Sequence, residues 1–441
     1  MTVLERGAAV GGLARTVSHG EFRFDLGGHR FLADNAEVTA FVRNLLGPEC
    51  LAVPRSSKIL MEGRLFDYPL KPVNAVFGFG LTKTARILRD YLGERLRRRV
   101  LPRRSIVSLE DWVVENFGRT LFDLYFRDYS EKVWGLSCEH IDKRWVKQRI
   151  QGLSLGKAIM RALRDPTGRR EATLADEFLY PRRGIGCIAE QLAGSLTGRL
   201  RLQTTVTEIH HEQNKISTVL TKDATGLSAV EATHHISTLP LQALVAALRP
   251  RPPASVLMAA SQLRSRDLVL VAVMADAERL TDQTWVYFPD KDIPFGRIHE
   301  PKNWNADMAP AAQTCVVAEY FCFRGDRTWN ASDADLANQT VAHLQQTGIM
   351  RGAQASDYKV IRVPDAYPLF EVGYHEHCEL IYQYLERFDN LTLAGRGGMF
   401  RYYNMDTAIA SGMDAAKTAL QYHRQDDAGA GPSATALGGT S

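Results

Sequence analysis

The stretch that decides the fold is Met1–Thr16, MTVLERGAAVGGLART. A short apolar run ends at Glu5, and a loop then leads to the glycine pair Gly11-Gly12. A strand ending in an acid follows the first βα unit of a dinucleotide-binding fold, where the carboxylate accepts hydrogen bonds from a ribose hydroxyl. That unit carries a Gly-rich phosphate turn about 20 residues before the acid, but only Met-Thr-Val-Leu precedes Glu5 here. The pattern predicts the second strand of such a domain, with roughly 30 residues of its first βα unit missing because Met1 is an internal start.

Composition bounds the class of protein. The chain has 441 residues, enough for two or three folding units, and 45% hydrophobic with 24% charged residues is ordinary for a globular protein. A net charge of +4 is too small to indicate a nucleic-acid partner. No apolar run reaches the ~18 residues of a membrane span, and no signal peptide is recognisable. The cysteines are dispersed without a C-x-x-C pair, which favours reduced thiols over a metal site. We therefore expect a cytoplasmic protein without a metal.

Nucleotide-fold signals occur in three separate parts of the chain, and a helical block and a strand-rich block lie between them. This order favours one discontinuous domain interrupted twice by a second domain. The tail is rich in Ala, Gly, Ser and Thr, which is typical of disorder. The predicted boundaries are 1–58, 172–250 and 382–423 for the nucleotide-binding domain, 59–171 and 251–381 for the second domain, and 424–441 for the disordered tail.

A second glycine pair follows the first. Arg15-Thr16 precedes a strand that alternates polar and apolar residues and ends in Asp25-Leu-Gly-Gly-His29. Each glycine pair alone has an ordinary explanation as a turn or a strand terminator. Together with Glu5 they resemble the N-terminal region of FAD-binding flavoproteins, the group of protoporphyrinogen oxidase, the monoamine oxidases and UDP-galactopyranose mutase. The resemblance implies a Rossmann-like α/β FAD-binding domain, here N-terminally truncated, interrupted by a helical and antiparallel-sheet substrate domain.

Three later stretches agree with this resemblance. They are Tyr129–Gly135 (YSEKVWG), Tyr180–Gly186 (YPRRGIG) and Leu393–Ile409 (LAGRGGMFRYYNMDTAI). The first and last are similar to segments of UDP-galactopyranose mutases. In that family the helix after the last motif directs its N-terminus at the flavin, where the positive end of the helix dipole stabilises the charge of the reduced ring.

The resemblance implies a set of site residues. No catalytic base stands out, because flavin performs the chemistry and the protein orients the substrate. Tyr129 and Trp134 have packing in the core as their alternative role, and Arg396 has the FAD pyrophosphate as its alternative ligand. The implied FAD contacts are Glu5, Gly11, Gly12, Arg15, Gly27, Gly28, Val206, Gly395, Met405 and Asp406, and the substrate-site candidates are His29, Tyr129, Trp134, Arg149, Arg396 and Tyr402.

The reaction divides the family into two branches. Tyr129–Gly135 and the closing motif favour the mutase, whereas the segment after Trp134 lacks the Asn-Tyr-Asp-Asn-x-Tyr-Phe stretch with which mutases meet uridine. Ser108–Gly118 instead looks like the substrate domain of the oxidases. We predict an FAD-dependent oxidoreductase that transfers a hydride from a small molecule, for example a sugar nucleotide or a lipid-linked intermediate, to flavin N5. The alternative is a mutase that uses reduced FAD on a sugar nucleotide, and a non-catalytic relative is third.

One run of charge belongs to none of these motifs. Arg95–Arg104 (RLRRRVLPRR) carries six arginines. It has two interpretations. The first is a solvated helix end, with cations favoured near the C-terminus and Pro102 stopping the helix. The second is a patch for an anionic membrane surface or a phosphorylated substrate.

Overall fold

The computed structural model describes residues 1–31, 35–68, 80–100, 105–149 and 177–429. The chain forms two compact units. Unit 1 comprises Met1–Ala9, Gly198–Leu263 and Glu376–Ser441, and unit 2 comprises Val10–Thr197 and Arg264–His375. Of the residues that we expected in the nucleotide-binding domain, the described parts of 10–58 and residues 177–197 group with unit 2.

Unit 1 contains two short parallel strand pairs. β1 (Val3–Leu4) pairs with β8 (Leu200–Arg201), and β12 (His235–Ser237) pairs with β19 (Leu391–Leu393). Among the described residues each pair is a sheet of its own. Parallel pairing between strands so distant in sequence agrees with the predicted α/β class.

The rest of unit 1 is a small sheet with helices. β9 (Thr205–Glu212) and β10 (Lys215–Asp223) form a hairpin, flanked by β11 (Gly226–Val230) and β13 (Leu248–Arg249). The helices are α10 (Leu241–Ala247), α11 (Ala254–Gln262), α14 (Tyr374–Leu385), α15 (Gly395–Gly398) and α16 (Met405–Gly429).

The closing helix α16 is longer than expected. Residues 424–429, which we predicted to be disordered, are helical, and residues 430–441 lie outside the described residues. Between Gly412 and Gly429 the sequence contains neither glycine nor proline. Because nothing in that interval breaks a helix, α16 continues through it.

Unit 2 is built on a seven-stranded sheet in the order β18-β14-β17-β16-β15-β5-β6. All neighbours are antiparallel except β15 and β5. The bounds are β5 (Ser57–Met61), β6 (Arg64–Asp67), β14 (Ser265–Ala275), β15 (Trp285–Tyr287), β16 (Arg297–His299), β17 (Thr314–Cys322) and β18 (Ala355–Pro368).

Both faces of this sheet are covered, which explains the apolar run of β14. Val269, Val271 and Val273 belong to a cluster that includes Leu336 and Leu344 of α13 (Asp333–Gln346). The alternate residues of β14 belong to a second cluster that includes Phe24 and Leu26. Successive side chains point to opposite faces of a strand, so a strand buried on both faces must be apolar throughout.

A second layer of unit 2 carries the N-terminal motifs. β2 (Thr16–His19) and β3 (Phe22–Asp25) form an antiparallel pair, and β4 (Cys50–Pro54) pairs with β7 (Glu177–Pro181). The predicted helices are present as α1 (Ala36–Leu46) and α9 (Cys187–Gly194). The Asn35 side chain accepts from the amides of Glu37 and Val38 in the first turn of α1, which fixes where that helix begins.

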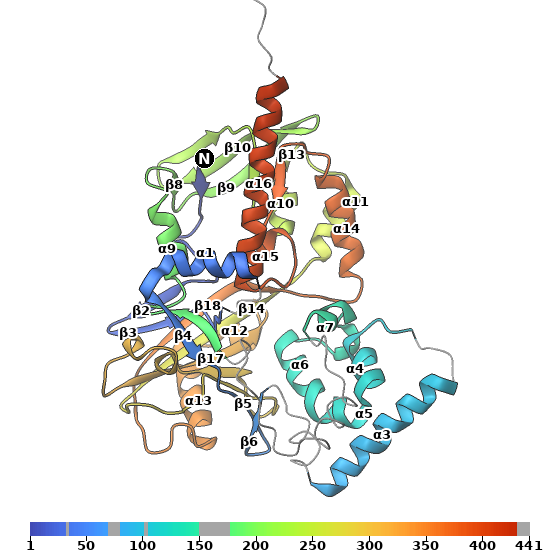
Figure 1. Ribbon diagram of the computed structural model, residues 1–441, viewed down its shortest axis with the longest axis vertical. Coiled ribbons are helices and arrows are strands. Elements are labelled where there is room, and N and C mark those ends of the chain that lie inside the picture. Colours follow the sequence, from blue (N-terminus) through green and yellow to red (C-terminus); the bar gives the residue numbers. More distant parts are fainter. Residues whose placement is uncertain (32–34, 69–79, 101–104, 150–176, 430–441) are drawn as a thin grey trace, which may run out of the picture. The chain divides into compact units, whose positions relative to one another are not determined.

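The helical block is confirmed over the described residues. Figure 1 shows α4–α7 gathered together, with α3 along one side of them. Ser108 and Asp111 form a capping box at the start of α4. The segments are α3 (Leu81–Val100), α4 (Leu109–Phe117), α5 (Arg119–Leu121), a π-helical turn (Phe122–Phe126), α6 (Arg127–Trp134) and α7 (Lys143–Arg149), with short 3₁₀ turns and α12 (Arg327–Asn330) elsewhere. Within the described part of the chain, no helix combines the length and apolar character that crossing a bilayer requires.

Candidate active site

A buried carboxylate joins three of the predicted motifs in unit 2. Asp25 ends β3 and is 1% exposed. It accepts hydrogen bonds from the Thr16 hydroxyl (2.6 Å), the Tyr180 hydroxyl (2.7 Å) and the Ile185 amide (3.1 Å). Burial raises the pKa of Asp25 to about 6, against the opposing effect of these donors. The sequence motifs at 15–16, 25–29 and 180–186 are therefore one structural unit.

The loop before β2 offers a donor without a partner. Gly11 and Gly12 have positive φ angles of 100° and 54°, which glycine adopts without strain. A Cβ at Gly12 would meet nothing within 4 Å, so this side of the loop is open. Arg15 Nε is buried and has no hydrogen-bond partner among the described residues. A buried guanidinium N–H next to an open glycine turn fits an anionic ligand, and the pyrophosphate predicted there is one.

Glu319 stands at a core position of β17. It shares a face of this strand with Cys315, Val317 and Phe321, which are all buried in the cluster around Phe24. Glu319 is fully buried. Its Oε1 atom accepts the Gly28 amide at 3.1 Å, and its Oε2 atom accepts two N–H groups of Arg297 at 2.7 and 2.6 Å. A carboxylate in the core thus holds the second glycine pair in place.

The charge of Glu319 is compensated from the neighbouring strand. Arg297 of β16 lies directly opposite Glu319 in the antiparallel register. Burial alone would raise the pKa of Glu319, but attraction to Arg297 lowers it to about 2. Burial alone would lower the pKa of Arg297, but its attraction to Glu319 raises that pKa above the usual value. The pair is therefore ionised throughout the physiological range.

Aromatic rings and one further arginine lie beside this pair. The Trp285 ring lies so close to Gly28 that a Cβ there would come within 2.1 Å of it. The guanidinium groups of Arg30 and Arg297 lie over that ring, at 4.4 and 4.7 Å from its centroid. Arg30 also donates to Ser57 at 3.1 Å, and burial lowers the pKa of Arg30. We call Arg30, Trp285, Arg297 and the tyrosines described next the aromatic–arginine cluster.

Three tyrosines extend the cluster away from Gly28. Tyr287 is stacked on Trp285 at 5.9 Å, and Tyr68 and Tyr129 lie at 4.4 and 5.7 Å from Tyr287. Arg55 lies 5.8 Å from the Tyr68 ring, and its buried Nε atom has no hydrogen-bond partner in the described part of the chain. The structure thus connects two predicted regions, Gly27-Gly28 and Tyr129, through Trp285 and Tyr287.

The remaining candidates of unit 2 differ in their surroundings. His29 is half-buried, and its Nδ1 atom lies 3.1 Å from the Gly27 carbonyl oxygen, which holds the ring close to its own backbone. Trp134 is 2% exposed and packs edge-on against Trp145 and Phe370. These contacts are those of a core anchor, so a substrate role for Trp134 stays a prediction. Arg149 ends α7, and its side chain lies outside what the structure describes.

In unit 1 the closing motif folds back on itself. Arg396 donates from Nε and Nη2 to the Tyr403 carbonyl at 2.9 and 2.6 Å, and its guanidinium lies 5.3 Å from the Tyr402 ring. Gly395 has a φ of 76° and donates its amide to Ser411 at 3.1 Å. Arg396 is therefore partly committed to shaping this loop, in addition to any role with a phosphate.

The other predicted FAD contacts in unit 1 stay predictions. Met405 and the buried Asp406 form the first turn of α16, whose amide groups point out of its N-terminal end. The Glu5 carboxylate accepts the Gly7 amide at 2.5 Å. Val206 lies in β9, opposite Thr221 of β10.

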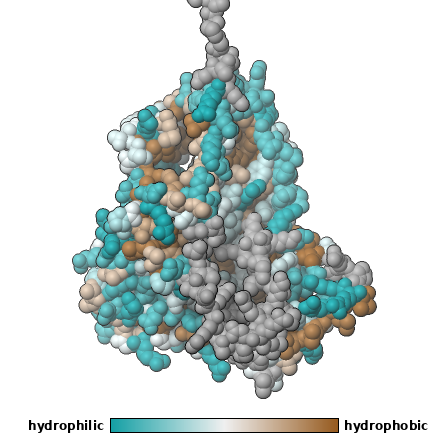
Figure 2. Space-filling view, viewed as in Figure 1, coloured by the Kyte–Doolittle hydropathy of each residue, from teal (hydrophilic) through white to brown (hydrophobic). Residues whose placement is uncertain are grey.

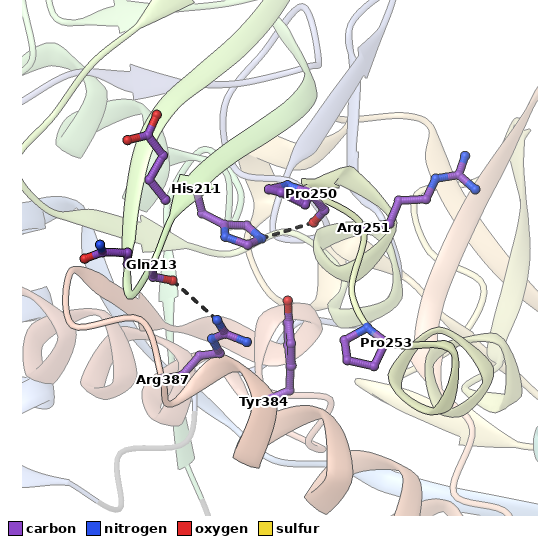
Figure 3. Close-up of a pocket in the computed structure, with 8 residues that line it drawn as sticks. His211, Gln213, Pro250, Arg251, Pro253, Tyr384 and Arg387 are labelled. Atoms are coloured by element: carbon purple, nitrogen blue, oxygen red, sulfur yellow. Dashed lines mark hydrogen bonds between the residues drawn. The ribbon is translucent and has the colours of Figure 1, made fainter.

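Unit 1 also contains an open pocket of about 640 Å³ (Figure 3). In it His211 contacts the Pro250 carbonyl oxygen at 3.1 Å, and Arg387 donates to the Gln213 carbonyl at 3.4 Å. Tyr384 stands beside Arg387, whose guanidinium lies 5.2 Å from its ring. None of the residues predicted for the FAD or substrate site lines this pocket.

Sequence reasoning missed Arg30, Trp285, Tyr287, Arg297 and Glu319. Arg30 directly follows the predicted His29 and could have been included with it. Glu319 carries a weaker signal, because one acid in the apolar run TCVVAEYFC falls on a core face and therefore requires a partner. Nothing in the sequence indicates that Arg297 is this partner, because the pairing depends on the register of two strands.

Comparisons with known proteins place this geometry in context. The model of the flavin-containing amine oxidoreductase family matches residues 1–420. Among solved structures, reduced UDP-galactopyranose mutase is 19% identical, with a TM-score of 0.81 over 95% of this chain and 90% of that chain. A putative protoporphyrinogen oxidase from Exiguobacterium sp. 255-15 is 17% identical (TM-score 0.70, coverage 97% and 93%). Cyclohexylamine oxidase from Brevibacterium oxydans IH-35A is 11% identical (TM-score 0.65, coverage 96% and 94%). At these identities the likeness establishes the fold alone.

Proposed function

The chain belongs to the family of flavin-containing amine oxidoreductases, and on that premise we propose that it oxidises a substrate that carries negative charge. Its cofactor is FAD, which accepts a hydride at N5 in the reactions of this family. The residues of this chain bind the cofactor, orient the substrate and exclude water.

The observation that carries the proposal is the position of Arg30 and Arg297 over Trp285, beside the glycine pair assigned to the flavin. Glu319 neutralises Arg297. Arg30 donates a hydrogen bond to the neutral Ser57, which does not offset its charge, so the cluster keeps positive charge. An amine substrate is cationic at neutral pH and would be repelled here. A phosphate or carboxylate would be attracted, and guanidinium groups bind both through paired N–H donors.

The aromatic rings suit the remainder of such a substrate. Tyr68, Tyr129 and Tyr287 form a continuous contact from Trp285 outward. Rings of this kind stack on a sugar or on a flat heterocycle and keep water away from the reacting atoms. Burial raises the pKa of Tyr129, so its hydroxyl is protonated and can donate a hydrogen bond to an anionic oxygen.

Two regions, each considered within its own unit, are our candidates for holding FAD. We assign Arg15 and the Gly11-Gly12 turn to the pyrophosphate, on the grounds of the unpartnered Nε atom and the open side of the turn. We assign the first turn of α16 to the flavin ring, where its amide groups would stabilise negative charge.

A sugar-nucleotide mutase is the second candidate, and the same cluster favours it. The diphosphate of a sugar nucleotide is the kind of anion that Arg30 and Arg55 could recognise, and no net oxidation would take place. The structural likeness to the mutase is compatible with either reaction.

A substrate panel separates these functions. The flavinated protein is incubated in air with amines, and separately with sugar nucleotides and isoprenoid phosphates, and hydrogen peroxide and dye reduction are measured. Oxidation of an anionic compound, lost in Arg30→Met and kept in the surface control Arg64→Met, supports the proposal. Oxidation of amines alone contradicts it. Conversion of a UDP-sugar only after dithionite reduction, without peroxide, assigns the mutase reaction.

A further inference from the structure

Helix α3 has two different sides. Thr84, Ile87 and Tyr91 are 5%, 0% and 9% exposed, and this side packs on α4 and α5. Leu92 and Leu96 are 61% and 63% exposed, and Val100, four residues further on, is 73% exposed. Residues four apart lie on one side of a helix, so these three form a continuous apolar stripe that faces solvent.

Arginines border this stripe. On a helical projection Arg89 falls between the stripe residues, Arg99 falls directly beside Leu92, and Arg86 and Arg95 lie further out on opposite sides of the stripe. All four are exposed. Figure 2 shows the mixture of apolar and hydrophilic side chains along α3.

The acidic residues of α3 are engaged within unit 2. Asp90 accepts from the Thr120 amide at 3.2 Å and pairs with Arg89 at 3.1 Å, and Glu94 pairs with Arg97 at 2.8 Å. Arg98 pairs with Glu115 of α4 at 3.2 Å. Arg86, Arg95 and Arg99 are exposed and are not part of these ion pairs, so the outward side of α3 carries an excess of positive charge beside its apolar side chains.

A solvated helix end accounts for the arginines but not for the stripe. Single exposed apolar residues are ordinary on protein surfaces. Three in a row at helical spacing, bordered by arginines, form the pattern of a helix that lies in a membrane interface. There the apolar side chains enter the acyl boundary, and the arginines reach up to the lipid phosphates.

We propose that the outward side of α3 binds the surface of an anionic lipid bilayer. The cationic side chains select this partner over a neutral bilayer, and the stripe converts electrostatic attraction into shallow insertion. The proposal stands on α3 alone and does not depend on the proposed function.

Vesicle co-sedimentation of the full chain tests the apolar contribution. We expect binding to vesicles of phosphatidylcholine with phosphatidylglycerol, and at least tenfold weaker binding to phosphatidylcholine alone. Leu92→Glu/Leu96→Glu should abolish binding. The control Leu227→Glu changes a residue that is 73% exposed on β11 and should bind like the parent. Because all three positions are exposed, the variants should fold, which circular dichroism verifies.

The charge contribution has its own variant. Arg89→Glu/Arg99→Glu should weaken binding by well over tenfold, since each basic residue near an anionic surface contributes about fivefold. The control Arg64→Glu reverses an exposed arginine on β6 and should have a small effect. Equal loss in both charge variants would show nonspecific attraction and overturn the proposal.

Two other results would also overturn it. One is the absence of sedimentation with anionic vesicles at low salt. The other is a doubled molar mass in light scattering that disappears in Leu92→Glu/Leu96→Glu while vesicle binding is absent, because the stripe would then be covered by a second copy of the chain.

Discussion

The Tyr180 hydroxyl donates a 2.7 Å hydrogen bond to the carboxylate of Asp25, which precedes it by 155 residues. Both residues are buried, and burial raises the pKa of each. The contact fastens β7 to the end of β3, directly before the second glycine pair. The Asp25 carboxylate therefore connects β7 to the segment that leads into that pair.

Asp25 should make the stability of the protein depend on pH in an unusual direction. Its folded-state pKa is about 6 and its unfolded value 3.8. A raised folded pKa contributes stability that is complete below the unfolded value and is lost as pH rises through the folded value. The difference corresponds to about 3 kcal/mol. We expect the free energy of unfolding of the parent, minus that of Asp25→Asn, to fall by up to this amount between pH 4 and pH 7 in urea titrations.

A difference that is constant or rises over this range would contradict that prediction. It would mean that the donors from Thr16, Tyr180 and Ile185 stabilise the ionised form more than burial destabilises it. Glu319 does not disturb the comparison, because it is present in both proteins, and the stability that it loses as pH falls from its unfolded value of 4.5 toward 2 cancels in the difference.

The local parts of this architecture could be predicted from the sequence. The strand Phe22–Asp25, the capping box at Ser108 and the hairpin of β9 and β10 follow from alternation, capping and turn chemistry, which involve neighbouring residues only. The resemblance to flavoproteins supplied the link between distant motifs, and the family model confirms it.

The parts that depend on tertiary partners could not be predicted. Trp134 is equally compatible with a core and a site in sequence, and only the contacts with Trp145 and Phe370 place it in the core. The pairing of Arg297 with Glu319 depends on the register of β16 and β17, which no local pattern specifies. The end of α16 was misplaced because composition suggested disorder where helix formers continue.

Gly28 should tolerate no side chain because of Trp285. A Cβ at Gly28 would lie 2.1 Å from one ring carbon and 2.4 Å from another. We expect Gly28→Ala to lower the free energy of unfolding by about 1–3 kcal/mol and to shift the flavin absorbance spectrum. In a double-mutant cycle with Trp285→Leu, the double variant should be more stable than the sum of the two single losses predicts, by about 1 kcal/mol or more.

Gly93→Ala is the matched control for Gly28→Ala. Gly93 lies inside α3, and a Cβ there would meet nothing within 4 Å. Alanine should therefore stabilise this position by about 0.5–1 kcal/mol. Additive effects in the Gly28–Trp285 cycle would refute the steric explanation.

Arg15 should contribute to the affinity for FAD. Its buried Nε atom has no partner among the described residues, so a bound pyrophosphate would gain a charge-assisted hydrogen bond there. Such a bond contributes about 1.5–3 kcal/mol, which corresponds to an increase of the dissociation constant by about 10- to 100-fold in Arg15→Met. Flavin fluorescence titration of the apoprotein measures this dissociation constant, with Arg23→Met on β3 as the control. Equal affinities in the two variants would place the pyrophosphate elsewhere.

Glu319→Gln should be the most damaging of these substitutions. It removes the counter-charge of Arg297, which would remain fully ionised in the core, and it replaces one acceptor by an amide. Breaking a buried pair in this way costs about 3–5 kcal/mol, whereas Glu376→Gln at an exposed position should cost less than about 0.5 kcal/mol. Urea unfolding at pH 7 compares the stabilities of these two variants.

The double variant Glu319→Gln/Arg297→Met should recover part of the loss, because it removes the isolated charge as well. If the single and double variants are equally unstable, the damage comes from the lost hydrogen bond to Gly28 and not from the uncompensated guanidinium.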